Sequence, residues 1–222
     1  MNIEIRKASE KEVPFLVRTI IDAEKSGTSI LPYEKIFGLS EDETENILNS
    51  ILKQNEEDCE LSMDAFLVAF HDNKPIGAVS AWIEALNDVS SSVIKGNLLR
   101  QHLSMKNLIN ASKYWQNLQE VHFDIPVKSI QIGLVYVAEE ARGNRLAEKL
   151  IKQQLEVLQK KINQKEEKVF VQVYHNNLSA IKAYNRIGFE IIETKENLDK
   201  NLLGVLPDTK KVLMQLINIK NE

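Results

Sequence analysis

The stretch that decides the fold begins at Ser129 as SIQIGLVYVAEEARGNRLAEKLIKQQLEVLQKKI and resumes at Lys168 as KVFVQVYHNNLSAIKAYNRIGF. Residues 130–137 are mostly β-branched or apolar, which predicts a buried strand. After a turn at residues 141–144, apolar side chains recur at helical spacing, and residues 168–174 return to a strand pattern. Strand, helix and strand in this order predict a right-handed parallel βαβ unit. The apolar helical positions are Ala147, Leu150, Ile151, Leu155, Leu158 and Ile162.

The turn between the first strand and the helix carries groups that suit a phosphate. A helix N-terminus presents unpaired backbone N–H groups and the positive end of the helix dipole. Gly143 lets the backbone approach a ligand closely, and Arg142 and Arg145 add cationic donors. A short glycine signal is weak by itself, however, and an ordinary turn with two solvated arginines is the commoner explanation.

Two motifs in this stretch resemble those of the GCN5-related N-acetyltransferase (GNAT) superfamily. Residues 142–147, RGNRLA, resemble its acyl-CoA signature Gln/Arg-x-x-Gly-x-Gly/Ala, with Arg145 where the family usually has Gly. Residues 177–184, NLSAIKAY, followed by Gly188-Phe189, resemble its Asn-x-x-Ala-x-x-x-Tyr…Gly-Phe. The two motifs stand in the family's order, separated by a helix and a strand, and that combination is far more specific than either motif alone.

The resemblance implies an α/β protein with the GNAT acyl-CoA N-acyltransferase fold. We therefore expect a twisted mixed sheet with helices on both faces, formed by a single domain over residues 1–222. The resemblance does not reach about 27–63 and 85–128, which we expect to be insertions. An apolar hairpin at residues 65–83 supports the mixed sheet, since His71-Asp72-Asn73-Lys74-Pro75 is typical of a turn.

The resemblance also implies a function. The chain is expected to be an acetyltransferase that moves an acetyl group from the co-substrate acetyl-CoA to a primary amine, by direct attack in a ternary complex. The acceptor would be a small-molecule or peptide amine. The family's strand pair splays apart to admit the pantetheine, and Gly133 fits such a break. The residues expected to bind the carrier are Leu134, Val135, Tyr136, Val137, Arg142, Gly143, Asn144, Arg145, Leu146, Ala147, Asn177 and Tyr184.

The catalytic assignments are Tyr184, Glu84 and His175. Tyr184 stands where the family commonly has a tyrosine that protonates the departing thiolate; alternatively it is a core residue. Some family members have a base where this chain has Gln172, which cannot accept a proton. Glu84, acting through a water, and His175 are the main remaining candidates, and Glu84 is preferred. His122 and Asp124 rank below them, and bulk water would suffice for an amine with a modest pKa. Asn177 would bind the carrier, cap the following helix, or do both.

A second function of a different class stays open: a CoA-binding sensor or scaffold without catalysis. Arg145 and Gln172 favour it, because both depart from the family pattern, while the intact Asn177 and Tyr184 oppose it. A dinucleotide-binding domain would need a Gly-x-Gly-x-x-Gly fingerprint, which is missing.

Composition limits the partners, the metal binding and the cellular compartment that we expect for this chain. The formal net charge of −4 argues against nucleic-acid binding. Polar residues follow Met1 directly and no apolar stretch is long enough for a membrane span, so we expect neither a secretory signal nor a membrane partner. Cys59 is the only cysteine, which favours the cytoplasm. The four histidines lack the spacing of a metal site, so no metal is expected. The apolar final strand would be able to pair with a second copy, which leaves a homodimer open.

The charged segment at residues 34–64 has two possible interpretations. Between Glu34 and Asp64, ten acidic residues stand against Lys35 and Lys53. Such a run is usually a solvated face. It would also suit an arm that overhangs the acceptor site and attracts a cationic amine.

Overall fold

The structure, a computed structural model, describes residues 3–162 and 168–217. Within these residues a seven-stranded mixed sheet has the order β1-β2-β3-β4-β5-β7-β6. Only β4 and β5 pair in parallel, as the βαβ pattern predicts. The strands are β1 (Glu4–Lys7), β2 (Phe66–His71), β3 (Lys74–Ile83), β4 (Ile130–Val137), β5 (Val169–Tyr174), β6 (Phe189–Glu196) and β7 (Lys210–Leu216).

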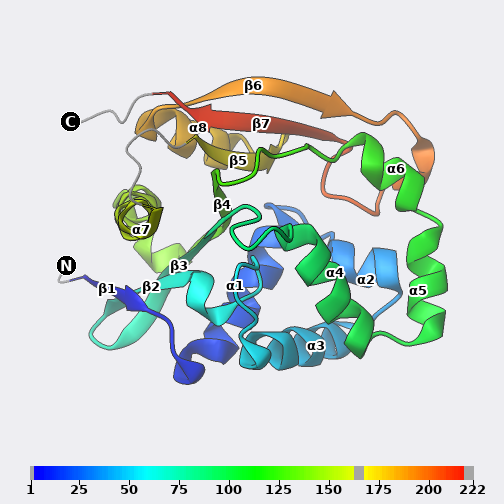
Figure 1. Cartoon of the computed structure of the whole chain (residues 1–222), viewed down its shortest axis with the longest axis horizontal. Helices are drawn as coiled ribbons and strands as arrows, with labels where there is room; N and C mark the ends of the chain where they lie inside the picture. Colours follow the sequence, from blue (N-terminus) through cyan, green and yellow to red (C-terminus); the bar gives the residue numbers. More distant parts are fainter. Residues whose placement is uncertain (1–2, 163–167, 218–222) are drawn as a thin grey trace.

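Helices cover both faces of the sheet, which confirms the predicted fold class (Figure 1). Successive residues of β2 enter two different cores: Leu67 and Ala69 pack with α7 and α8, whereas Phe66 and Val68 pack with α1, α3 and α4. This is the alternation of a strand buried on both faces. The helices are α1 (Val13–Lys25), α2 (Pro32–Phe37), α3 (Glu41–Gln54), α4 (Ser91–His102), α5 (Met105–Ser112), α6 (Trp115–Glu120), α7 (Leu146–Ile162) and α8 (Leu178–Ile187).

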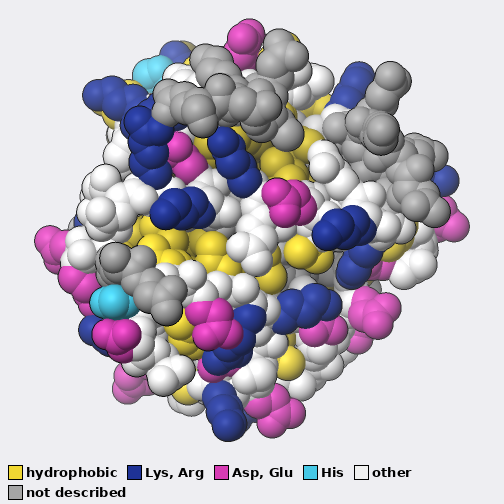
Figure 2. Space-filling view, turned by 90° about the vertical axis from the view of Figure 1, so that its left-hand side faces the viewer, with side chains coloured by type: hydrophobic (Ala, Val, Ile, Leu, Met, Phe, Trp, Pro, Cys, Tyr) yellow, Lys and Arg dark blue, Asp and Glu magenta, His cyan; other side chains and the backbone are white. Residues whose placement is uncertain are grey.

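The apolar stripe of α7 forms the centre of one core. Leu150, Ile151, Leu155 and Leu158 are all buried there, as their spacing predicts. The side chain of Ile162 lies outside the described residues. Figure 2 shows the face that lies at the left of Figure 1, where Lys and Arg side chains are interspersed with acidic and apolar ones. The buried stripe therefore holds α7 against the sheet, and charged side chains lie on the surface around the helix.

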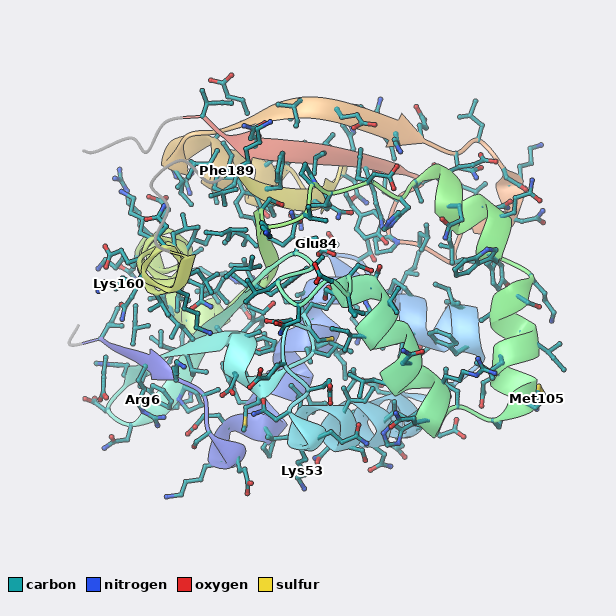
Figure 3. The ribbon with its side chains drawn as sticks, viewed as in Figure 1. Arg6, Lys53, Glu84, Met105, Lys160 and Phe189 are labelled. Atoms are coloured by element: carbon teal, nitrogen blue, oxygen red, sulfur yellow. The ribbon has the colours of Figure 1, made fainter. Side chains whose placement is uncertain are left out.

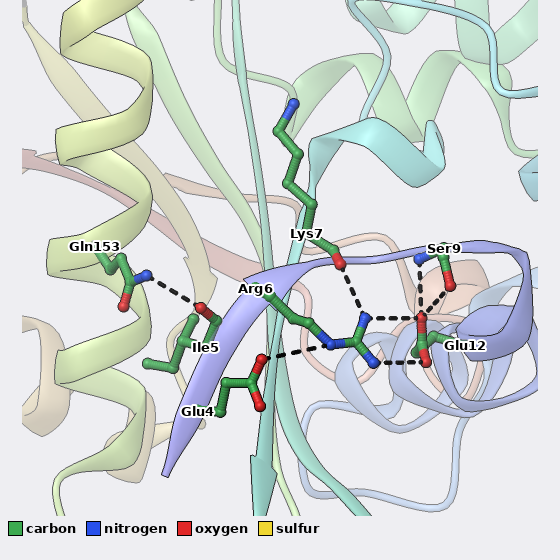
Figure 4. Close-up of polar contacts among 7 residues, drawn as sticks. All are labelled: Glu4, Ile5, Arg6, Lys7, Ser9, Glu12 and Gln153. Carbon is green, nitrogen blue, oxygen red and sulfur yellow. Dashed lines mark hydrogen bonds and ion pairs between the residues drawn. The ribbon is translucent and has the colours of Figure 1, made fainter. Parts of the chain in front are cut away.

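A polar network fixes the start of the chain (Figure 4). Ser9 and Glu12 form a capping box before α1, in which the Ser9 N–H donates to Oε2 of Glu12 at 2.9 Å. The Arg6 guanidinium donates to both carboxylate oxygens of Glu12, at 3.3 and 3.2 Å. From α7, Gln153 donates to the backbone oxygen of Ile5 at 3.3 Å. These contacts tie the edge strand β1 to a helix on each face of the sheet.

The two stretches without a sequence resemblance both form helices. Residues 27–63 contain α2 and α3, and residues 85–128 contain α4, α5 and α6. They lie beside each other (Figure 1), and α5 is bonded to α2: Asn107 donates to the Phe37 oxygen at 2.9 Å and Asn110 to the Ile36 oxygen at 3.0 Å. The stretches thus form one helical wall, although they are far apart in sequence.

The last strand is not at an edge of the sheet, contrary to the idea that it pairs with a second copy. β7 lies between β5 and β6 and is antiparallel to both. Its backbone hydrogen bonds are therefore satisfied on both sides, and the edges of the sheet are β1 and β6. Among the described residues, no helix is long and apolar enough to cross a membrane.

Candidate active site

A cleft of about 2150 Å³ runs along β4 and β5 and reaches the ends of α1, α4, α7 and α8. Along this cleft β4 and β5 separate from each other, as the family resemblance implies. Residues 130–132 of β4 pair with residues 169–171 of β5, but no pairing continues beyond Ile132 and Val171 within the described strands. β4 nevertheless extends to Val137 and β5 to Tyr174. A gap in the sheet is therefore present at the expected place.

Backbone groups of β4 face this gap. Tyr136 lies opposite Ala78 of β3, and Ala138 donates to the Ile76 oxygen at 2.8 Å. Alternate residues of an antiparallel strand point their N–H and C=O groups to opposite sides. Val135 and Val137 therefore present theirs toward β5. The N–H of Leu134, in contrast, donates to Ser80 Oγ on β3 at 2.9 Å and is already satisfied.

Gly133 is required by a tryptophan packed on the strand. A Cβ at this position would lie 2.5 Å from Cζ3 of Trp82 and 2.8 Å from Oγ of Ser80. The Trp82 indole N–H in turn donates to Oε2 of Glu84 at 2.9 Å. The missing Cβ thus lets Trp82 lie over the β4 backbone, next to the irregular register between Val79 and Ala81.

Glu84 lies in the cleft, at the end of β3 beside α4 (Figure 3). It is only 9% exposed, and each oxygen has a donor: Trp82 bonds Oε2, and the backbone N–H of Ser91 bonds Oε1 at 3.2 Å. Ser91 is the first residue of α4, so this carboxylate helps to satisfy the start of that helix. Both oxygens of Glu84 are therefore occupied by hydrogen bonds that hold α4 against β3.

The turn before α7 has the conformation that its motif predicts. Gly143 has φ +83°, with open space where its Cβ would be. Arg145 has φ +54°, a left-handed backbone that glycine adopts more readily. This explains why the family signature has Gly there, and it shows that Arg145 keeps the geometry. Arg142 donates through Nε to the Val137 oxygen at 3.2 Å, while Asn144 donates to backbone oxygens of the turn and does not line the cleft.

Asn177 connects the second motif to α1. Its side-chain oxygen accepts from the N–H of Ala180 at 3.2 Å, so it caps α8 as predicted. Its amide group donates to Oγ of Ser26 at 2.8 Å, just after the end of α1. His175, two residues earlier, is exposed and is not among the residues that line the cleft. The structure thus does not bring His175 to the site.

Tyr184 lines the cleft while most of its side chain is buried. Its ring packs against Phe189, with centroids 5.7 Å apart, in the core that also includes Ala180 and Ile187. Burial raises the pKa of the Tyr184 hydroxyl, so the group is protonated at neutral pH. Tyr184 is therefore a core residue that also lines the cleft, with a hydroxyl that is protonated at neutral pH.

Sequence reasoning missed a cluster of charged and phenolic groups in the same cleft. The Glu60 carboxylate is 2.5 Å from the Lys95 ammonium. The ammonium of Lys211 lies 4.7 Å from the centre of the Tyr174 ring. Among the described residues, the Glu24 carboxylate accepts no hydrogen bond and has no cation within 4 Å. The cluster consists of Glu24, Tyr33, Glu60, Lys95, Tyr174 and Lys211.

Burial is the largest single influence on the pKa values of Glu24, Tyr33, Lys95, Tyr174 and Lys211. It raises the pKa of Glu24, against the opposing effect of the Lys95 and Lys211 ammonium groups. It lowers the pKa of Lys211, and Glu24 partly offsets this effect. For Lys95 burial is outweighed by Glu60 and its other neighbours, so the pKa of Lys95 rises well above its ordinary value. Glu24 is thus a more basic carboxylate than a solvated glutamate.

The sequence did contain a signal for two of these residues. The buried residues of α1 include Val13, Val17 and Ile20, and Glu24 takes the next position on that stripe. Lys95 likewise lies four residues after Ser91 and four before Leu99, which are both buried on α4. A charged residue on the apolar stripe of a helix is rarely placed there by chance.

No group of three metal-ligating side chains is found in the described part of the chain. Residues 33–189 match the family described as "Acetyltransferase (GNAT) family". A comparison with curated protein sequences gave no significant match.

Solved structures share the fold at low sequence identity. An N-acetyltransferase from Staphylococcus aureus Mu50 is 15% identical, with 96% of this chain and 99% of that chain covered and a TM-score of 0.66. A polyamine N-acetyltransferase from Drosophila melanogaster is also 15% identical, with 98% and 100% covered and a TM-score of 0.57. An agmatine N-acetyltransferase gives the same identity and TM-score, with 97% and 99% covered.

Proposed function

The chain belongs to the GNAT acetyltransferase family and is an acetyltransferase, and from this premise we propose that it moves an acetyl group from acetyl-CoA to a primary amine by direct attack in a ternary complex. Two of the structural neighbours are named as an agmatine and a polyamine N-acetyltransferase. Agmatine and polyamines are amines, and this supports an amine acceptor for this chain. The observation that carries the proposal is that the gap between β4 and β5 and the unpaired carboxylate of Glu24 belong to one cleft.

The carrier would be held by the turn before α7 and by β4. The open space at Gly143 and the N-terminus of α7 suit the pyrophosphate, and Arg142 supplies a charged donor beside them. The outward-facing N–H groups of Val135 and Val137 would bond the pantetheine and the thioester oxygen. Leu134 contributes its side chain alone, since its N–H is bonded to Ser80.

Glu24 is the best-placed base for the amine. Glu84 has both oxygens engaged, and His175 does not line the cleft, so the two bases expected from the sequence are less suitable. The Glu24 carboxylate is unpaired among the described residues, and its raised pKa improves its ability to accept a proton. It would take the proton of the acceptor ammonium.

The remaining proton transfer is assigned to Tyr184. As the amine nitrogen bonds to the carbonyl carbon, the carbon–sulfur bond breaks and the thiolate needs a proton. Tyr184 lines the cleft, and its hydroxyl, which is protonated at neutral pH, would supply it. The attacking nitrogen still carries one surplus proton after it has bonded to the carbonyl carbon, and this proton would return to the Tyr184 phenolate. Over one cycle Tyr184 is therefore restored and Glu24 gains one proton, which it releases to solvent.

The test is release of free thiol from acetyl-CoA in the presence of a panel of amines. We expect Glu24→Gln to lower kcat at least about 10²-fold, the usual contribution of a general base, and to leave acetyl-CoA affinity unchanged. Glu156→Gln, on the exposed face of α7, is the matched control and should behave like the parent. Tight carrier binding without thiol release for any amine would contradict the proposal and favour a CoA-binding sensor.

A further inference from the structure

The charges that line the cleft are mostly neutralised within the protein. Among the acids, Glu84 accepts two hydrogen bonds, and Glu140 is paired with Lys74 at 2.9 Å. Among the cations, Lys25 is paired with Glu41 at 3.8 Å. Three further ion pairs join Asp22 to Arg18 at 3.6 Å, Glu60 to Lys95 at 2.5 Å and Glu148 to Arg186 at 2.7 Å.

Two half-buried groups of opposite charge are exceptions. Within the described residues, Glu24 is the half-buried acid of the cleft that has no cation within 4 Å, and Lys211 is the half-buried cation that has no carboxylate within 4 Å. Each influences the pKa of the other, so they lie in the same part of the cleft without forming an ion pair. An unneutralised charge that is partly withdrawn from water is costly, and a ligand of opposite charge would remove this cost.

A third group points to the same place. Tyr33 is 5% exposed and lines the cleft. The Lys95 ammonium lies beside it and opposes the rise in the Tyr33 pKa that burial causes. Tyr33 therefore adds a buried phenol to the lining of this part of the cleft.

We propose that the acceptor is a zwitterion, with its amine against Glu24 and an acidic group of the same molecule against Lys211. This inference rests on the proposed function, because Glu24 must receive the amine that is acetylated. A free amino acid or another small compound with an amine and a carboxylate has this chemistry.

A diamine fits less well. It would bring a second positive charge to a site where the other carboxylate of the buried cluster, Glu60, is already held by Lys95. That second charge would also meet Lys211, and like charges in a half-buried site repel. The run of acidic residues before Asp64 therefore does not by itself make this a polyamine site.

The experiment compares L-amino acids with their carboxamides as acceptors in the thiol-release assay. The carboxamide keeps the amine and loses the acidic group, and its amine is the more readily deprotonated of the two. A higher kcat/KM for the acid therefore reports recognition of the carboxylate. We expect a preference of about 10- to 100-fold, the effect of one charge-assisted hydrogen bond.

Lys211→Met should abolish this preference, and Lys211→Arg should largely keep it. Lys210→Met is the matched control on the same strand, because Lys210 is paired with Glu196 at 3.7 Å and does not line the cleft. Acetyl-CoA affinity, measured for every variant, shows that the fold is retained.

Equal kcat/KM for acids and carboxamides in the parent would overturn the inference while leaving the proposed function intact. An unchanged preference in a folded Lys211→Met protein would also overturn it. No thiol release with any amine would overturn the proposed function together with the inference.

Discussion

Replacing Gly133 by alanine should destabilise the protein through a single methyl group. The added Cβ would lie 2.5 Å from Cζ3 of Trp82, far inside van der Waals contact. Trp82 would have to move, and its indole N–H would leave the carboxylate of Glu84. Gly133 has no positive φ, so the backbone itself accepts alanine and the cost arises from packing.

The expected loss follows from three contributions. Overpacking a core site costs about 1–3 kcal/mol. A weakened hydrogen bond to a charged group costs about 1.5–3 kcal/mol. The lower entropy of the unfolded alanine chain returns about 0.4–1 kcal/mol. The net destabilisation is about 1.5–5.5 kcal/mol, which corresponds to a decrease in Tm of about 3–22 °C for a chain of this length.

The assay is thermal unfolding of Gly133→Ala beside Gly96→Ala. Gly96 lies inside α4, and nothing is within 4 Å of the position where its Cβ would be. Alanine there should stabilise the helix by about 0.5–1 kcal/mol and raise Tm slightly. The two substitutions are chemically identical and are expected to have opposite signs. A Gly133→Ala protein with the Tm of the parent would refute the close packing of Trp82 on β4.

Three further outcomes concern the site. Tyr184→Phe should lower kcat at saturating acetyl-CoA by about 10²-fold and leave carrier affinity nearly unchanged, whereas a kcat within about threefold of the parent would exclude a general acid. Arg142→Ala should weaken CoA binding by about 1–3 kcal/mol, measured by calorimetry, because a charge-assisted bond to phosphate is lost. The acidic limb of the kcat/KM profile should follow the protonation of Glu24. Because burial raises the pKa of Glu24, activity should fall at a higher pH than the pH at which a solvated glutamate becomes protonated. Lys211 lowers the pKa of Glu24, so Lys211→Met should move that limb to higher pH, and an unmoved limb would exclude Glu24 as the base.

Much of the fold could be predicted from the sequence, because local patterns specify it. The apolar hairpin at residues 65–83 and the stripe of α7 each identify an element by itself. The family match extends over residues 33–189 and includes most of the first stretch that lacked a recognisable motif and all of the second. In the second stretch α4, α5 and α6 span twelve residues or fewer each, and their limits could not be predicted from the sequence.

The site was predictable only where a motif defines it. The turn around Gly143, the cap at Asn177 and the position of Tyr184 follow from consecutive residues. The acceptor side depends on groups brought together from α1, α4 and β7, and no local pattern records that Glu24 and Lys211 share a cleft. Glu84 was recognised as a candidate base, but its bonds to Trp82 and Ser91 are visible only in three dimensions.

The place of β7 within the sheet affects how the chain is made. β5 and β6 pair with β7, and β7 follows both of them in the sequence. During synthesis on the ribosome, one side of β5 therefore stays unpaired until residues 210–216 have emerged, and β6 waits for the same segment. Two nascent strands are thus open to wrong partners until their shared partner strand emerges near the end of translation. Stop codons or frameshifts shortly before Lys210 should consequently give aggregated chains rather than a shortened enzyme, because such a chain lacks the strand that closes the sheet.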